Sequence, residues 1–273
     1  MALMAEAWQR RIPYLVVGGG TNLLATDEGV PGVVINLSRG CQRIETFKDR
    51  KGAIRILVDA GVHTKALCRY CLSNGLRGMN FALGIPGTVG GAIRMNAGTP
   101  LGVMSDRLLY IEVAYPMGAP KKVYQDHLHG RYRELCWDKV ADVEATYPPV
   151  ILGGAFEVAA SAPEVLKEEA RRIVVSRSLS QPKHRGSAGC FFKNPSPNTP
   201  AGRLIEQSGL KGMHRGGAVV SEKHANFILN TGHATAEDIL GLMKTVQETV
   251  FNEFGIMLEP EVQIVGQEKS SKK

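Results

Sequence analysis

The stretch Gly84-Ile-Pro-Gly-Thr-Val-Gly-Gly-Ala92, continued by Asn96-Ala-Gly98, carries almost no side-chain bulk. Bare backbone of this kind lets a flat ligand lie directly against it. A long surface loop is the alternative, but a loop that only turns the chain rarely retains Ile85, Thr88 and Val89 in a glycine frame. The stretch therefore predicts the wall of a cofactor site. The residues expected to line it are Gly84, Ile85, Pro86, Gly87, Thr88, Gly90, Gly91, Ala92, Asn96, Ala97 and Gly98.

A second glycine cluster follows the apolar run 14–17, which predicts a strand and then a tight turn. Its residues are Gly18, Gly19, Gly20, Thr21, Asn22 and Leu23. Successive backbone amides in such a turn can converge on an anion such as a pyrophosphate. The cluster is neither a dinucleotide fingerprint, which needs glycine where Leu23 stands, nor a P-loop, which needs Gly-Lys-Ser/Thr. Alone the cluster is more typical of a simple turn than of a ligand site, and the stretch at Gly84 shifts the interpretation toward a ligand site.

Apolar spacing and turn residues divide the chain into two parts. Four prolines fall between Pro182 and Pro200, which places a boundary near residue 180. We expect a domain over 1–180, a smaller domain over 181–266 and a basic tail over 267–273. The predicted helices cover 3–12, 63–74 and about 161–178, and the predicted strands 33–35, 54–58, 108–115, 150–152 and 156–158.

The smaller domain carries two clear local signals. Thr235-Ala-Glu-Asp238 predicts a capped helix that Gly255 ends. The segment 256–265 predicts a strand, on which alternation puts Glu259 and Glu261 on one face and Leu258, Val262 and Ile264 on the other. In the first domain, Ser161-Ala-Pro-Glu164 has the pattern of a capping box that begins a helix.

Composition excludes several classes of protein. The chain has 273 residues, 44% of them hydrophobic, which is typical of a globular protein. It lacks an apolar run long enough for a membrane span, and its N-terminal stretch does not fit a secretory signal. The net charge of +7 is dispersed without interleaved aromatics, which argues against nucleic-acid binding. The five cysteines are an odd number in a long chain, which indicates free thiols in a reducing compartment, so we expect a cytoplasmic protein. The pair Cys68 and Cys71 lacks a second pair, so we assign it to packing rather than to a metal site.

Four motifs occur in one order: Gly18-Gly-Gly-Thr-Asn-Leu-Leu24, Gly84–Ala92, Gly189-Cys-Phe-Phe-Lys-Asn-Pro195 and Leu258-Glu-Pro-Glu-Val262. Together with 201–206 and 223–227 they closely resemble the UDP-N-acetylenolpyruvoylglucosamine reductases, flavoenzymes also called UDP-N-acetylmuramate dehydrogenases. The resemblance covers about residues 8–266. The short stretch between Arg133 and Tyr147 resembles the shorter type of the family, which lacks an extra substrate-capping insertion.

The resemblance implies an α+β protein with an FAD-binding domain of the vanillyl-alcohol-oxidase type, followed by a smaller α+β substrate-binding domain. NADPH would reduce the flavin, and the flavin would reduce the enolpyruvyl group of a nucleotide sugar in peptidoglycan precursor synthesis. That reduction requires a proton donor, a group that supports the protonation and a cation that stabilises the enolate. By resemblance these are Cys190, Glu261 and Arg133, and Lys193, Asn194 and His224 fall at positions that contact substrate.

The match departs from the family pattern at several positions. Cys190 stands where the family usually has Ser, and a thiol is a stronger acid than a hydroxyl while staying mostly protonated at neutral pH. Arg131 is near enough to Arg133 to be the true equivalent, because Leu135 replaces a usual Ser. A Lys often found near Ser180 is absent. The family's first strand and helix, with a Thr-Phe-x-x-Gly-Gly-like stretch that helps hold FAD, have no counterpart in this sequence. We expect either a wrongly chosen start or a shortened protein with an incomplete flavin site. A vestigial flavin-binding non-enzyme is therefore the main alternative, and a related FAD oxidase is the other.

Overall fold

The computed structural model describes residues 2–138, 147–182 and 186–266, and the chain forms two compact units. Unit 1 comprises Met1–Gly19 and Gly32–Val175, and unit 2 comprises Gly20–Pro31 and Ser176–Lys273. The segment Gly20–Pro31, which lies within the predicted first domain over 1–180, therefore belongs to the second unit. The predicted basic tail, 267–273, and residues 139–146 of the short stretch before Tyr147 lie outside the described residues.

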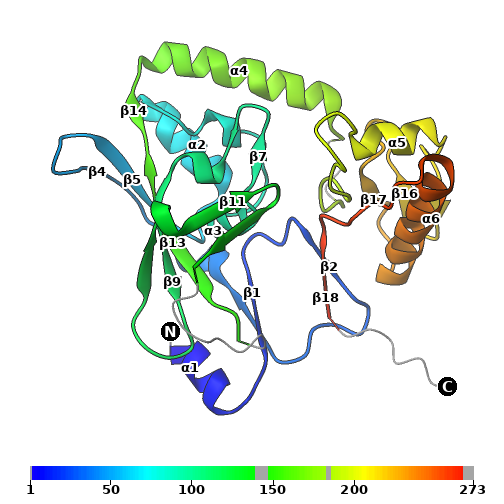
Figure 1. Ribbon diagram of the computed structural model, residues 1–273, viewed down its shortest axis with the longest axis horizontal. Helices are drawn as coiled ribbons and strands as arrows, with labels where there is room; N and C mark the ends of the chain where they lie inside the picture. The colour runs from blue at the N-terminus through cyan, green and yellow to red at the C-terminus, as the bar shows by residue number, and fades with distance from the viewer. Residues whose placement is uncertain (1, 139–146, 183–185, 267–273) are drawn as a thin grey trace. The chain divides into compact units, whose positions relative to one another are not determined.

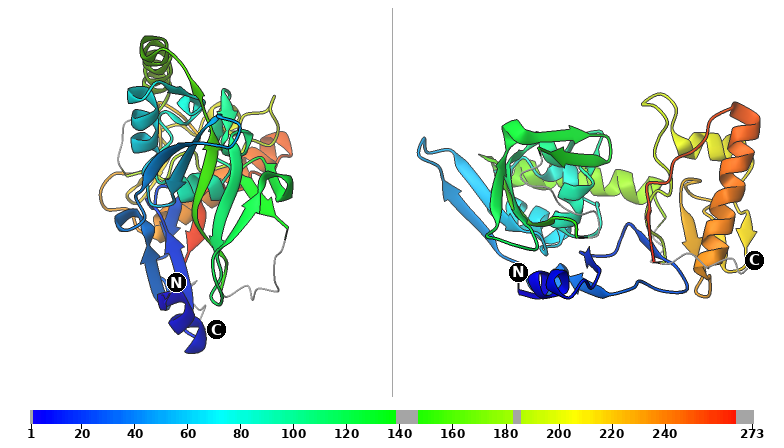
Figure 2. Two further views of the ribbon diagram at one scale, coloured as in Figure 1. Left: turned by 90° about the vertical axis from the view of Figure 1, so that its left-hand side faces the viewer. Right: turned by 60° about the horizontal axis from the view of Figure 1, so that its bottom comes forward.

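A five-stranded antiparallel sheet is the frame of unit 1 (Figure 1), and its order is β10-β9-β13-β5-β4. The β4–β5 hairpin extends beyond the rest of the unit, as both Figure 1 and Figure 2 show. The strands are β4 (Ile44–Lys48), β5 (Ile54–Asp59), β9 (Leu108–Ala114), β10 (Lys121–Tyr124) and β13 (Val150–Glu157).

Two helices pack against this sheet and form the main core with it. They are α2 (Thr64–Ser73) and α3 (Val89–Arg94). Leu67 of α2 and Ile93 of α3 are fully buried in one cluster with Ile56, Ile111 and Phe156 of the sheet. Cys68 and Cys71 lie in the same cluster, and burial raises the pKa of each thiol to about 12, so both are packing residues.

Short elements complete unit 1. Helix α1 (Ala2–Gln9) covers the parallel pair of β1 (Tyr14–Val17) and β3 (Val33–Asn36) in a second, smaller core. The two-stranded pairs are β6 (Leu76–Arg77) with β14 (Ala159–Ala160), β7 (Gly98–Thr99) with β8 (Gly102–Val103), and β11 (Leu128–Arg131) with β12 (Glu134–Trp137). Single 3₁₀ turns are η1 (Leu37–Arg39), η2 (Asn80–Ala82), η3 (Met104–Asp106) and η4 (Gln125–His127).

Unit 2 is built around one long helix, α6 (Ala236–Phe254). It packs on the antiparallel sheet of β15 (His214–Arg215), β16 (Ala218–Val220) and β17 (Ile228–Asn230), and on α5 (Ala201–Gln207) (Figure 1). Leu242, Val246 and Val250 are its buried stripe. A parallel pair, β2 (Leu23–Ala25) with β18 (Gln263–Val265), joins the segment Gly20–Pro31 to the end of the chain.

The predicted ends of α6 are confirmed in atomic detail. Thr235 Oγ1 accepts the Asp238 amide at 3.0 Å, and Asp238 Oδ2 accepts the Thr235 amide at 3.1 Å, which is a capping box. Asp27 of the segment Gly20–Pro31 accepts the next two amides, Ala236 at 2.8 Å and Glu237 at 3.1 Å. At the other end Gly255 takes the left-handed conformation, with φ of 68°.

Two expectations about helix α4 and strand β13 are wrong. Helix α4 (Pro163–Ser180) begins at Pro163 rather than at a Ser161 capping box, because proline fits the first helical turn and the Ser161 amide donates to Gly75 O at 2.8 Å. The two strands expected over 150–158 are one strand, β13, since Gly153 lacks a Cβ that would approach Val58 O to 2.6 Å. None of the described helices, α4 included, is long and apolar enough to cross a membrane.

The strand expected over 256–265 is also wrong in extent. Only Gln263–Val265 is strand, preceded by an isolated bridge between Phe192 and Pro260. Proline cannot donate to a ladder, which prevents a continuous strand here. Leu258 and Val262 are buried as expected, but Ile264 is exposed, so the strict alternation fails at its end.

Candidate active site

The stretch Gly84–Ala92 forms a loop and the start of α3 in unit 1. Gly84 and Gly87 have φ of 80° and 96°, which side chains rarely adopt, so glycine is needed at both. The buried Thr64 of α2 donates its hydroxyl to the carbonyls of Ile85 and Gly87 and holds the loop in place. Gly90 packs on Ala60, where an added Cβ would come within 2.7 Å of the alanine Cβ.

The two glycine segments meet in unit 1 at Gly18 and Thr88. A Cβ placed on Gly18 would lie 2.1 Å from Thr88 Oγ1, so only glycine allows this approach. Thr88 is buried, and within the described ranges its hydroxyl has no hydrogen-bond partner. A buried hydroxyl is normally satisfied, so this one fits a ligand with acceptor oxygens, such as the pyrophosphate of FAD. The residues present therefore fit the expected cofactor.

Asn96 and Gly98 connect this loop to the hairpin of β11 and β12. Asn96 is buried in a left-handed conformation with φ of 41°; its Nδ2 donates to Arg131 O at 3.0 Å and its Oδ1 accepts the Ser105 amide at 2.9 Å. Gly98 pairs with Val103, whose Cγ1 would lie 2.4 Å from an added Cβ. Both residues, expected beside the cofactor, also fix the local backbone.

Arg131 and Arg133 differ in their surroundings, although they flank the same turn. Arg133 takes the left-handed conformation, with φ of 59°, is half-buried, and donates Nη1 to Gly98 O at 3.4 Å. Its guanidinium lies over the Tyr132 ring, 4.9 Å from the centroid. Arg131 is exposed and belongs to β11. Of the two, Arg133 has the fixed side chain next to the predicted cofactor wall.

In unit 2, Cys190 and Glu261 lie on two neighbouring backbone segments. The amide of Glu261 donates to Phe191 O at 2.8 Å, and the amide of Lys193 donates to Glu259 O at 2.8 Å, on either side of the Phe192–Pro260 bridge. Cys190 is half-buried after Gly189, whose φ of 86° requires glycine. The backbone thus brings the Cys190 and Glu261 positions together from 71 residues apart in sequence.

The turn residue Asn22 belongs to the same region of unit 2. Its Nδ2 donates to Glu261 O at 3.0 Å, and its own carbonyl accepts the Gln263 amide at 2.9 Å. Leu23 follows and pairs with Gln263 in the β2–β18 ladder. Both residues are predicted cofactor residues; in the structure Asn22 binds the Glu261 backbone, and Leu23 pairs with the next strand position, Gln263.

The three predicted substrate residues have different partners. Lys193 Nζ lies 3.3 Å from Glu259 Oε2 in an exposed ion pair. Asn194 Oδ1 accepts the amide of Ala201, the first residue of α5, at 3.0 Å. His224 is half-buried; burial is the main cause that lowers its pKa, Lys211 adds to the effect, and Glu206 opposes it. The lowered pKa favours the neutral form of the His224 ring at neutral pH.

Sequence reasoning missed Asn226, which is 3% exposed and bonded to the backbone of Phe191 and Phe192. The available signal was an asparagine inside the apolar segment Ala225–Leu229, because a buried amide must find partners.

The comparisons with known proteins cover nearly the whole chain. Residues 181–265 match the family model described as the C-terminal domain of UDP-N-acetylenolpyruvoylglucosamine reductase. The reductase of that name from Desulfosudis oleivorans is 46% identical over 265 residues, 97% of this chain and 84% of the relative. The chain belongs to the UDP-N-acetylenolpyruvoylglucosamine reductase family.

Membership in the reductase family confirms the expected fold class and enzyme class. Residues 1–123 match an FAD binding domain, so this reductase-family chain is a flavoprotein and an oxidoreductase. The reductase of Syntrophobacter fumaroxidans is 41% identical over 99% of this chain and 76% of the relative. The crystal structure of the Thermus caldophilus reductase matches with a TM-score of 0.76 at 36% identity, covering 96% of this chain and 89% of that one. The α+β architecture with an FAD-binding domain and a smaller C-terminal domain follows from these matches.

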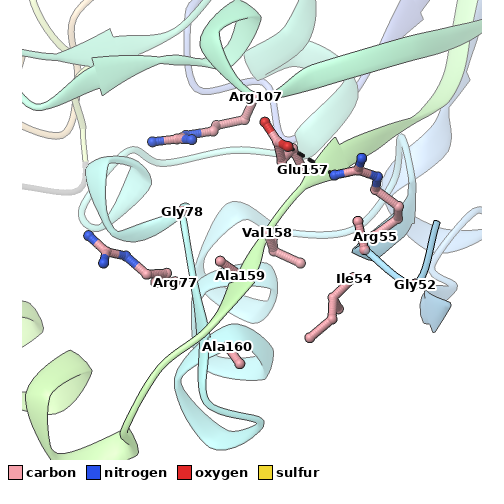
Figure 3. A pocket seen from close by; sticks show the side chains of 11 residues that line it. Gly52, Ile54, Arg55, Arg77, Gly78, Arg107, Glu157, Val158, Ala159 and Ala160 are labelled. Carbon is pink, nitrogen blue, oxygen red and sulfur yellow. Dashed lines mark hydrogen bonds and ion pairs between the residues drawn. The ribbon is translucent and has the colours of Figure 1, made fainter. Parts of the chain in front are cut away.

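A cavity of about 680 Å³ in unit 1 has none of the predicted site residues in its lining. Arg55, Arg77, Arg107 and Glu157 line it, and Figure 3 shows Arg55 turned toward Glu157, with their ion pair at 3.0 Å. Its lining includes neither Gly18 nor any residue from the stretch Gly84–Gly98. This cavity is therefore not the predicted cofactor site.

Proposed function

We propose that this chain reduces the enolpyruvyl group of UDP-N-acetylglucosamine enolpyruvate to UDP-N-acetylmuramate, with NADPH as reductant, in the cytoplasm and as a step of peptidoglycan precursor synthesis. The observation that carries the proposal is a backbone hydrogen bond in unit 2. The Glu261 amide donates to the carbonyl of Phe191, the residue that follows Cys190 in the sequence. The names of relatives at 41–46% identity point to the same substrate. Bound FAD would supply the hydride-transfer chemistry that links NADPH to the enolpyruvyl double bond.

The chain's own residues would supply binding and proton transfer. Thr88 and the glycines at Gly18 and Gly84–Gly91 offer a hydroxyl and bare backbone to FAD. Cys190 would donate its thiol proton to the carbon beside the substrate carboxylate, and the resulting thiolate would be reprotonated from water. Glu261 would support this transfer, and Arg133 would stabilise the enolate through its positive charge.

The neutral state of His224 suits a substrate contact that does not depend on charge. Its Nδ1 accepts the Asn226 amide at 3.3 Å, so the ring proton is on Nε2, which is left to donate to a substrate oxygen. Asn194 and Lys193 would bind the substrate from the same motif that carries Cys190. Glu259 and the substrate would compete for Lys193, so the Lys193–Glu259 ion pair would break when the substrate binds.

Separate half-reactions test the proposal. The FAD-loaded protein is reduced anaerobically with NADPH and then mixed with the enolpyruvyl substrate, and flavin absorbance is followed by stopped flow. Cys190→Ala should leave reduction near the wild-type rate and slow reoxidation by about 10²–10⁴-fold, because the proton is needed only in the second half-reaction. Cys190→Ser should recover much of that loss.

Cys41→Ala is the matched control, since Cys41 is a half-buried free thiol of unit 1 outside the predicted site. It should leave both half-reactions unchanged. Equal losses in both half-reactions of Cys190→Ala would mean that Cys190 is a structural residue. A flavin-loaded wild-type protein that the enolpyruvyl substrate does not reoxidise would contradict the proposed function itself.

A further inference from the structure

We infer that Asn226 is the positioning residue of this site: it fixes the backbone that carries Cys190 and at the same time sets which ring nitrogen of His224 bears the proton. This inference rests on the proposed function for its catalytic meaning. The contacts themselves lie entirely within unit 2.

Asn226 makes three hydrogen bonds to the two residues after Cys190. Its carbonyl accepts the Phe191 amide at 2.7 Å, its Oδ1 accepts the Phe192 amide at 2.9 Å, and its Nδ2 donates to Phe192 O at 2.8 Å. The side chain is thus bound at both its donor and its acceptor. Such a pair of bonds fixes both the distance and the rotation of the bound peptide, and in a buried place each lost partner is costly.

The same segment carries Glu261 on its other edge. Phe191, whose amide Asn226 binds, accepts the Glu261 amide at 2.8 Å through its carbonyl. A shift of the Phe191–Phe192 backbone would therefore move Cys190 and disturb Glu261 together. Placement errors of about 1 Å can cost about 10²-fold in rate, so this control matters for proton transfer.

Asn226 also acts on His224 through its own amide, which donates to His224 Nδ1 at 3.3 Å. A ring nitrogen that accepts has no proton, so the neutral ring carries its proton on Nε2. The ring is confined by Phe227, at 5.0 Å between centroids, and by Gly202, where an added Cβ would lie 3.1 Å from Cε1. One residue thereby links a proposed substrate donor to the proposed proton donor.

Asn226→Asp tests the inference because it keeps the shape and removes the donor. An ionised carboxylate accepts from the Phe192 amide but repels Phe192 O, whereas a protonated carboxyl can both accept and donate. Burial raises the pKa of a carboxyl, so acid should protonate the Asn226→Asp side chain and restore both of its hydrogen bonds to Phe192. The charged groups near His224 are Lys211 and Glu206, and they are the same in wild type and variant. We expect slowed reoxidation at pH 8, by about 10–10²-fold, and recovery relative to wild type as the pH falls.

A second measurement on the same variant does not depend on catalysis. The rate at which iodoacetamide alkylates Cys190, followed by mass spectrometry of its peptide, should differ from wild type at pH 8 and approach it in acid. Asn230→Asp is the matched control. Asn230 Oδ1 accepts the Gly232 amide at 2.7 Å and the Ala234 amide at 3.0 Å, and an aspartate oxygen can accept both. It should change neither rate.

The outcomes separate the inference from the proposed function. Unchanged alkylation of Cys190 in Asn226→Asp overturns the positioning role. Changed alkylation with normal reoxidation supports the positioning role and contradicts the catalytic role of Cys190. If the variant does not fold, nitrogen NMR of wild-type His224 decides: a proton on Nε2 supports the link to Asn226, and a proton on Nδ1 overturns it.

Discussion

At the scale of single residues, Glu259 and Glu261 show how two similar side chains two positions apart acquire different surroundings. Glu259 is 75% exposed and paired with Lys193. Glu261 is half-buried, its amide is bonded to Phe191 O, and its carbonyl accepts from Asn22. Its backbone is therefore fixed on both sides, which suits the proposed acid–base role.

We predict that Glu261→Gln slows flavin reoxidation by about 10²–10⁴-fold, since a positioned acid–base group is lost. Glu259→Gln, the matched control, should be mild, because charge removal at an exposed site changes stability within about ±0.5 kcal/mol. Stopped-flow reoxidation of both variants measures this. The reverse ranking would move the catalytic assignment to Glu259.

Arg133 and Arg131 provide a second comparison of neighbours. Arg133→Ala removes the half-buried guanidinium that bonds to Gly98 O and should slow reoxidation by about 10²-fold or more, because the enolate loses a fixed positive charge. Arg131→Ala removes an exposed charge and should leave the rate near wild type. If Arg131→Ala is the slower variant, Arg131 is the family's arginine in this chain.

At the scale of elements, the local signals of α6 were predicted well, whereas the Ser161 capping box of α4 and the long-range pairing were not. The capping box of α6 and its Gly255 end depend on residues within one turn, so the sequence alone reveals them. The strand over 256–265 failed because its pairing depends on partners at Phe192 and Leu23, far away in sequence. Asp27, which binds the first amides of α6 from 209 residues away, could not be found by local reasoning either.

The capping box of α6 also predicts how the stability of the protein depends on pH. Its hydrogen bond from the Thr235 amide is the main cause that lowers the pKa of Asp238, followed by that from Gly217. Because the pKa of Asp238 is lower in the folded than in the unfolded chain, its ionised carboxylate stabilises the fold at pH values above the unfolded-state pKa, near 3.9. This stabilisation is lost as the pH falls through the folded-state pKa. Asp238→Asn should therefore lower Tm at neutral pH, and the difference from wild type should shrink below about pH 4.

Thermal melts across pH measure this difference. Glu253→Gln, an exposed position on the same helix, is the control and should give a small difference at every pH. A Tm difference for Asp238→Asn that persists unchanged at acid pH would show that the ionised carboxylate does not stabilise α6.

At the scale of the whole molecule, the sequence motifs fall into two units that the chain connects repeatedly. Gly18 and Thr88 meet in unit 1, whereas Asn22, Cys190, Asn226 and Glu261 belong to unit 2. The order of motifs therefore predicted the family and its two-part plan. It could not predict that the glycine turn ends unit 1 at Gly19 and opens unit 2 at Gly20, because that division depends on contacts with the C-terminal part of the chain.

At this scale we also predict FAD binding by the whole protein and the part that the buried Thr88 hydroxyl plays in it. We predict that the purified protein is yellow with non-covalent FAD, and that denaturation followed by gel filtration separates the colour from the chain. Thr88→Val preserves shape but removes the hydroxyl, so it should weaken FAD retention by about tenfold, as for one hydrogen bond to a charged group of about 1.5 kcal/mol. Because ligand binding stabilises the folded state, added FAD should also raise Tm less in this variant.

Thr46→Val is the matched control, since Thr46 is an exposed threonine of β4 whose hydroxyl bonds to Tyr70. It should retain FAD like wild type. Colour that stays with the denatured chain would mean a covalent flavin and would contradict this prediction. Equal FAD retention in Thr88→Val and wild type would mean that the Thr88 hydroxyl, although buried, does not contact the cofactor, and the pyrophosphate contact would then have to come from the backbone amides of the glycine segments alone.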